Sequence, residues 1–272
     1  MKIQHIYSTI LGALAMMMTL AACDDVPEDE RFLDVPMPEV QRTVLIEDFT
    51  GQRCVNCPTA SAEIEKIKQD YGTDKVIAVS IHAGPFSRSM LGKRYALATD
   101  EGDAYYEAAG ADHQPIGMVN RRGLSDYPQW ASAVYEQIQL TTPVTITLAA
   151  TLDEEQGTLE VLTSLLSGSD LAGAKLQLWL VEDGVVAFQM LPDGSTDSQY
   201  VHHHVLRAAL NGTWGEDVSL SVGVPLTLKR TVSLADYSNV TDIHNLSVVA
   251  FVYTAAGVLQ VAEVIPNEPQ NE

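Results

Sequence analysis

The stretch from residue 44 to residue 58 constrains the fold more than any other part of this chain. It begins with a mostly apolar run, Val44 to Phe49, and ends in Cys54-Val55-Asn56-Cys57-Pro58. An apolar run of this length indicates a buried strand. Proline directly after the second cysteine is tolerated in the first turn of a helix, where its missing N–H removes no hydrogen bond. The stretch therefore predicts a buried strand that leads into a helix opened by a C-x-x-C pair.

The residues after the pair continue an alternation of helices and strands. Apolar residues recur at helical spacing over 59–71, and Gly72 stops the pattern. A β-branched run over 75–82 predicts a second strand, parallel to the first because a helix joins them. The remaining expected elements are a helix over 97–109, a turn over 110–115, a strand over 116–120 and a helix from about 129 to 140.

This order of elements, with C-x-x-C at the first helix, resembles the thioredoxin fold. Asp48 stands six residues before Cys54, where thioredoxins carry a buried acidic residue, and Pro115 precedes a strand, as the family's cis-proline does. Two features depart from the family. Arg53 replaces the usual tryptophan before the first cysteine, and Val55-Asn56 is not a dipeptide of the best-known redox enzymes.

Beyond Pro143 the pattern changes to short strands separated by turn signals such as Asp183-Gly184. The strand-like runs are 144–152, 158–166, 174–181, 185–190, 218–234, 246–254 and 258–264. They predict an antiparallel β-sandwich of immunoglobulin-like type, by architecture and not by ancestry, because the Cys-Trp-Cys signature is absent. The expected fold is thus an α/β thioredoxin-like domain at 40–141 followed by an all-β sandwich domain at 143–266.

The N-terminal residues predict export and attachment of a lipid. An apolar run over 10–20 leads into Leu20-Ala21-Ala22-Cys23, which matches the lipobox of bacterial lipoproteins. Residues 1–22 are therefore expected to be a signal peptide and Cys23 to carry the lipid. The alternatives are an ordinary cleaved signal or a transmembrane anchor, for which the apolar run is short.

The chain has 36 acidic residues and 16 lysines and arginines, which gives a net charge of -20 over 272 residues. A nucleic-acid partner is excluded, because binding phosphates needs clustered lysine and arginine. Residues 23–39 begin with an acidic patch and are expected to form a solvated tether, and 267–272 a disordered tail. In lipoproteins of Bacteroides-type bacteria such a patch resembles a signal for export to the outer surface. In enteric bacteria, aspartate directly after the cysteine would instead imply the inner membrane.

The C-x-x-C pair is the predicted reactive centre. Cys54, expected at the helix start, would have a lowered thiol pKa and act as nucleophile, and Cys57 would be the resolving thiol. By resemblance to thioredoxins, Asp48 would accept a proton as Cys57 reacts. Pro115 would shape a groove in which the backbone of Gln114 meets an extended polypeptide.

The redox role of the pair stays open. Once Cys23 is lipidated, Cys54 and Cys57 are the only cysteines left and pair with each other. They either exchange thiols and disulfides with exported proteins or form a permanent disulfide on a binding scaffold. A zinc site would need further cysteine or histidine ligands, so neither a metal nor a cofactor is expected.

Two groups of histidines invite functional hypotheses. His82 ends the second strand and His113 precedes Gln114, near the strand ends where α/β sheets bind ligands; each is either a base acting on the thiols or a surface residue. His202 and His204 would share one face of a strand and suggest a metal. No glutamate or cysteine nearby completes the set, which favours polar histidines without a metal.

Several segments together resemble an outer-membrane lipoprotein family of Bacteroides-type bacteria: the lipobox, the acidic tether, 47–51 with 54–58, and 204–208 with 212–215. Its members are often described as adhesins or receptors with a thioredoxin-like region. The resemblance implies an outer-membrane protein anchored by an acyl chain such as palmitate and exposed at the surface. Two functions follow: thiol–disulfide exchange in exported proteins or peptides, or non-catalytic adhesion in which the sandwich binds a surface ligand.

Overall fold

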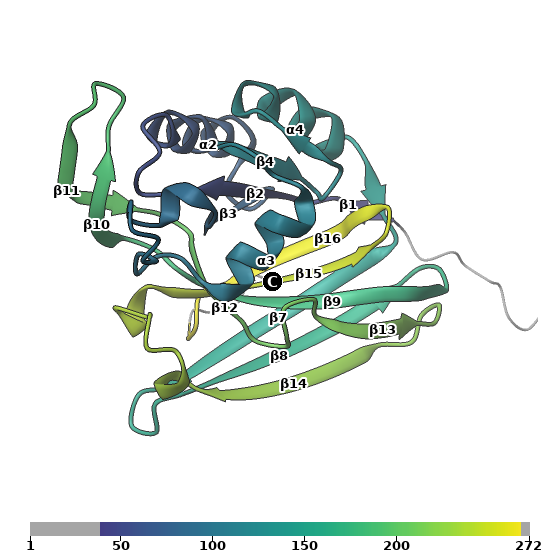
Figure 1. The fold of residues 1–272 in the computed structure, drawn as a ribbon. Helices are drawn as coiled ribbons and strands as arrows, with labels where there is room; N and C mark the ends of the chain where they lie inside the picture. Colours follow the sequence, from purple (N-terminus) through teal and green to yellow (C-terminus); the bar gives the residue numbers. More distant parts are fainter. Residues whose placement is uncertain (1–38, 268–272) are drawn as a thin grey trace, which may run out of the picture. The chain divides into compact units, whose positions relative to one another are not determined.

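The computed structural model describes residues 39–267, which are organised around a nine-stranded mixed sheet (Figure 1). The expectations for the signal peptide, the lipid on Cys23, the tether up to residue 38 and the tail from residue 268 lie outside the described residues. In spatial order the strands are β16 (Gly257–Val264), β15 (Leu246–Thr254), β9 (Leu171–Glu182), β12 (Val205–Ala209), β3 (Val76–His82), β2 (Val44–Thr50), β4 (Ile116–Val119) and β5 (Leu124–Ser125), with β13 (Glu216–Leu220) beside β9.

Strand β2 is buried along its whole length because both faces of the sheet are covered there. Val44 and Ile46 pack under helices α2 (Cys57–Tyr71) and α4 (Trp130–Ile138). Leu45 and Phe49 point to the opposite face, where helix α3 (Asp100–Ala109) contributes to the core. Successive side chains point to opposite faces of the sheet, and both faces are covered, so this run has no solvent-exposed polar face. β2 pairs in parallel with β3 and antiparallel with β4.

The helix boundaries follow local signals in the sequence. Helix α2 begins after Asn56, has Pro58 in its first turn, and ends at Gly72, whose φ of 103° disfavours any residue with a Cβ. Helix α3 is capped by Thr99, whose hydroxyl accepts a hydrogen bond from the N–H of Gly102 at 2.9 Å. The three helices expected from the sequence are therefore present; α2 begins two residues earlier than the expected 59–71, and α3 and α4 are slightly shorter than expected.

The second half of the chain is rich in β-structure. An antiparallel sheet of β14 (Leu226–Ser233), β8 (Thr158–Ser167) and β7 (Val144–Asp153) packs on β9 and β15 through a large apolar cluster. Leu178 and Leu180 of β9 belong to this cluster, whereas Trp179 and Val181 belong to the core shared with α3. β9 therefore fills two cores from its two faces.

One sheet runs through both ranges predicted as separate domains. β12 pairs antiparallel with β9, and its first residue, Val205, pairs in parallel with Ser80 of β3. The sheet also brings β16 close to the start of β2, where the N–H of Thr43 donates to Gln260 Oε1 at 2.8 Å. The two ranges share a sheet and a core, which the local sequence pattern did not predict.

Smaller elements complete the described chain. β10 (Val185–Met190) and β11 (Thr196–His202) form a separate hairpin, and β1 (Val40–Gln41) pairs with β6 (Thr141–Thr142). The expectation of one strand over 218–234 is wrong, because Gly223, at φ 70°, and Pro225 divide it into β13 and β14. No helix within residues 39–267 has the length and apolarity to cross a membrane.

Candidate functional site

Cys54 and Cys57 form a disulfide bond, and their Cα atoms lie 5.3 Å apart. Cys54 lies in the turn between β2 and α2, where its N–H donates to the carbonyl of Gly51 at 2.9 Å. Helix α2 begins at Cys57, so the prediction that Cys54 occupies the helix start is wrong. Cys54 lies three residues earlier, in the turn. Only 2% of Cys54 and 1% of Cys57 is exposed. A partner can therefore reach the sulfur atoms only when the residues covering them move.

The β10–β11 hairpin covers the C-x-x-C turn and is joined to it by hydrogen bonds. Gln189 Nε2 donates to the carbonyl of Cys54 at 2.8 Å, and Gln52 Nε2 donates to the carbonyl of Phe188 at 3.0 Å. The N–H of Met190 donates to the carbonyl of Gln52 at 2.8 Å. A hairpin more than 130 residues away in the sequence is thus attached to the turn that carries the disulfide.

A pocket of about 250 Å³ lies beside Cys57. Its walls come from β2, α2, β3 and the hairpin, and include Thr50, Cys57, Ser61, His82, Tyr200 and His202. Residues far apart in the sequence therefore meet in one pocket beside the disulfide.

Asp48 lies next to this pocket and has an unusual environment. It pairs in register with Ser80 and lies on the same sheet face as Thr50, and both of those residues line the pocket. Neither carboxylate oxygen of Asp48 has a hydrogen-bond partner among the described residues, and the side chain is fully buried. Burial raises the pKa of Asp48 to about 7. Asp48 can therefore gain or lose a proton near neutral pH.

Two neutral imidazoles share the pocket. The rings of His82 and His202 meet edge to face with centroids 5.1 Å apart. Burial lowers the pKa of His82 well below its usual value and that of His202 to about 4. Both ring nitrogens of His82 and Nε2 of His202 lack partners among residues 39–267. His82 is therefore not a surface residue, and these nitrogens are free to bond a group in the pocket.

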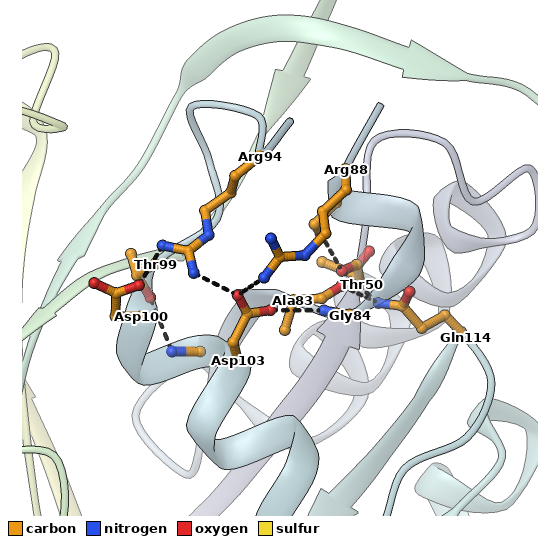
Figure 2. A network of polar contacts seen from close by, with 11 residues as sticks. Thr50, Ala83, Gly84, Arg88, Arg94, Thr99, Asp100, Asp103 and Gln114 are labelled. Atoms are coloured by element: carbon orange, nitrogen blue, oxygen red, sulfur yellow. Dashed lines mark hydrogen bonds and ion pairs between the residues drawn. The ribbon is translucent and has the colours of Figure 1, made fainter. Parts of the chain in front are cut away.

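Gln114 and Pro115 lie where β4 begins, and the peptide bond between them is cis. The amide of Gln114 donates to the carbonyls of Thr50 at 2.6 Å and Ala83 at 3.1 Å (Figure 2). The side chain of Gln114 thus ties together the ends of β2 and β3. A contact between its backbone and a polypeptide stays a prediction.

His113 and His204 lie outside the imidazole pair. His113 is exposed, and its ring nitrogens donate hydrogen bonds to Asp126 and Asp112, which raise its pKa. The prediction that His204 shares a strand face with His202 is wrong: β11 ends at His202, and His204 takes a φ of 54° in the following turn. In the described part of the chain, no group of three or more His, Cys, Asp and Glu residues is arranged to hold a metal ion.

Sequence reasoning missed the hairpin as part of the site. The sequence pattern gave no role to Gln189 or Tyr200, and it suggested His202 only as a metal ligand. A periodic pattern cannot show this contact, because the residues that meet Cys54 are long-range neighbours. Asp48, by contrast, was predicted through its spacing from the first cysteine.

Comparisons of fold add to this geometry. HBP35 of Porphyromonas gingivalis has a similar structure, with a TM-score of 0.66, 15% identity, and coverage of 87% of this chain and 80% of that chain. The E. coli curli protein CsgC has a TM-score of 0.24 at 12% identity, covering 46% of this chain and 99% of that chain. A Listeria innocua β-glucosidase has a TM-score of 0.26 at 18% identity, covering 46% and 16%. The last two likenesses are too weak to support an argument.

Comparison of sequence identifies the family. No curated protein matches the chain significantly. The family model "Outer membrane protein Omp28" matches residues 102–270, which leaves Cys54 and Cys57 outside the matched range. The predicted outer-membrane location is confirmed by this match. Since the model covers more than half of the chain, the protein belongs to the Omp28 family of outer membrane proteins.

Proposed function

We propose that this protein exchanges thiols and disulfides with exported polypeptides, through Cys54 and Cys57 in a thioredoxin-like region anchored by a lipid on Cys23. Asp48 carries the proposal, because its buried carboxyl group has no hydrogen-bond partner, among residues 39–267, beside the pocket of Cys57. Burying such a group lowers stability. A disulfide with only a structural role has no need of it, whereas a resolving thiol needs a nearby proton acceptor.

The arrangement of elements supports a thioredoxin-like region. β2 leads to the C-x-x-C turn and α2, β3 runs parallel to β2, and β4 and β5 follow as antiparallel strands after Pro115. Helices α2 and α4 contribute to the core on one face of these strands and α3 to the core on the other. The order, the directions and the place of the proline agree with the resemblance that the sequence suggested.

The exchange would proceed in two steps. In the reduced protein, the Cys54 thiolate attacks a sulfur of the substrate disulfide, that bond breaks, and one substrate sulfur leaves as a thiolate that takes up a proton. Cys57 then gives its proton to Asp48 and attacks Cys54 Sγ, which restores the protein disulfide and releases the second substrate sulfur as a thiolate that takes up the proton from Asp48. The substrate gains two electrons and two protons, and the reverse sequence oxidises a substrate dithiol.

The imidazole pair, His82 and His202, would relay the proton held by Asp48. His82 and His202 are neutral at physiological pH, and each has an unpartnered ring nitrogen in the described structure. A neutral imidazole can accept a proton at one nitrogen while it donates one from the other. The pair would thus connect the buried carboxyl group with the pocket.

The alternative function is that of a surface adhesin or receptor with a structural disulfide. The near-complete burial of Cys54 and Cys57 favours it, because inert disulfides are commonly inaccessible. In that case the β-rich half of the protein would bind the surface ligand.

A trapping experiment tests the proposal. The Cys57→Ala variant, expressed in its own host, should accumulate mixed disulfides between Cys54 and exported polypeptides that dissociate with dithiothreitol. A Cys54→Ala/Cys57→Ala variant is the matched control and should give none. If Cys54 of the single variant reacts with a maleimide but captures no polypeptide, the redox proposal fails. If the double variant restores adhesion to cells that lack this protein, the adhesin function would then be supported.

A further inference from the structure

A tight turn within residues 88–94 carries the two most exposed large apolar side chains of the described chain. Met90 is 83% exposed and Leu91 is 97% exposed. The N–H of Gly92 donates to the carbonyl of Ser89 at 2.9 Å, so Met90 and Leu91 occupy the two central positions of the turn. Side chains at these positions point to solvent, and turns therefore favour polar residues or glycine there. Packing within the fold does not explain two large apolar residues at this tip.

The base of the turn is fixed to helix α3. Arg88 and Arg94 face each other across the turn, and both guanidinium groups bind Asp103 Oδ2 (Figure 2). The other oxygen of Asp103 accepts the N–H of Gly84 at 3.0 Å. Arg94 also contacts Asp100. Ion pairs at its base thus fix the turn to α3.

Cations surround the apolar tip. Arg53 Nη2 lies 2.7 Å from the sulfur of Met90, and Lys93 is exposed in the turn itself. Neither Arg53 nor Lys93 forms an ion pair with a carboxylate among residues 39–267. Arg88 and Arg94, which pair with Asp103 and Asp100, lie at the base below them, so among the described residues Arg53 and Lys93 are the two cations free at the tip of a protein with a net charge of -20. Apolar side chains flanked by cations are typical of segments that enter a membrane interface.

We propose that the tip formed by Met90 and Leu91 inserts into a lipid bilayer, while Arg53 and Lys93 bind anionic headgroups. A bilayer is at hand because the protein is located at the outer membrane. A stable protein partner would need about 800 Å² of surface on each side, whereas interfacial lipid binding needs only a few apolar side chains and cations. Headgroups sense charges within about 8 Å at physiological ionic strength. Asp103 and Asp100 pair with Arg88 and Arg94 at the base of the turn, so within the described chain Arg53 and Lys93 are the cations at the tip that remain for headgroups.

Vesicle binding tests this proposal on the full chain with Cys23→Ser, which removes the lipid anchor from the measurement. Vesicles of phosphatidylcholine with phosphatidylglycerol should bind the protein, and vesicles of phosphatidylcholine alone should bind it more weakly. Met90→Ser/Leu91→Ser should weaken binding by roughly tenfold or more. Val222→Ser/Val224→Ser, which changes two exposed apolar residues on another loop, is the matched control and should leave binding unchanged.

Further readouts separate insertion into lipid from docking to a protein and from loss of the fold. Thermal unfolding should not change in either double variant, since all four side chains are exposed. An environment-sensitive fluorophore on a Leu91→Cys variant should shift to the blue when anionic vesicles are added. Equal vesicle binding by the parent and Met90→Ser/Leu91→Ser proteins would overturn the proposal. So would a lack of vesicle binding combined with protein adducts from a photo-crosslinker at residue 91, because the tip would then dock a protein.

Discussion

Replacing Asp48 with asparagine should stabilise the oxidised protein at alkaline pH. The pKa of Asp48 rises from 3.8 to about 7, a change of about 3 units, because the folded protein buries it without a partner among the described residues. Each unit corresponds to about 1.36 kcal/mol, so ionised Asp48 costs the folded state about 4 kcal/mol. Asparagine has the shape of the protonated acid and no ionisation. The variant should therefore gain up to about 4 kcal/mol over the parent near pH 8.

The sign of this pH dependence follows from which state releases its proton first. Below pH 3.8 Asp48 is protonated in both states and costs nothing extra. Between pH 4 and 7 the unfolded chain loses the proton before the folded protein, and the parent is progressively destabilised. His82 and His202 act oppositely, because their lowered pKa values reduce folded stability as pH falls below 6.5. They are present in both proteins and cancel in the difference.

Urea unfolding followed by circular dichroism, from pH 4.5 to pH 8, measures this difference. Asp70→Asn, on the exposed surface of α2, is the matched control and should show no comparable trend. A difference between Asp48→Asn and the parent that does not grow with pH would refute the reasoning. It would mean that Asp48 ionises normally and that the folded protein satisfies its charge.

Two further predictions concern contacts around the site. Gln189→Ala removes the hydrogen bond to Cys54 and should speed reduction of the disulfide by dithiothreitol by roughly fivefold or more, since a hydrogen bond contributes about 1 kcal/mol. Gln199→Ala, at an exposed position on the same hairpin, is the control and should leave the rate unchanged. Equal rates for Gln189→Ala and the parent would refute the idea that the hairpin restricts access to the disulfide. Arg121→Gln leaves Glu47 buried without its ion pair and should lower the free energy of unfolding by about 3–5 kcal/mol, measured by urea titration.

Local sequence patterns were sufficient to predict most elements. The apolar run before the cysteines became β2, and Gly72 ended α2 as expected. The strands over 144–153 and 158–167 followed from apolar residues in alternation. In each case the signal lies within the element itself, where propensity, burial and capping act over a few residues.

Long-range pairing was not accessible in the same way. β12 joins the halves of the central sheet through Val205 and Ser80, which are separated by more than 120 residues. The strand β11 is largely exposed, so it lacks the apolar alternation that marks a strand. His204 adopts a positive φ without being glycine, and the turn that separates it from His202 therefore had no signal.

The candidate site was predicted in part for the same reason. The spacing of Asp48 from Cys54 pointed to a buried acidic residue, and the structure describes it as buried. The missing partner of Asp48 within the described chain, the pocket and the covering Gln189 depend on contacts between distant segments. These three features decide how the disulfide can react, and they required the three-dimensional structure.

The midpoint reduction potential of the Cys54–Cys57 couple in the intact protein tests the central claim most directly. The protein is equilibrated in dithiothreitol or glutathione buffers of graded potential, its thiols are trapped with a maleimide, and the reduced fraction is measured by mass. Thiol–disulfide exchange predicts a reversible two-electron transition above about -300 mV. A couple that stays oxidised to lower potentials would belong with structural disulfides and contradict the proposed function.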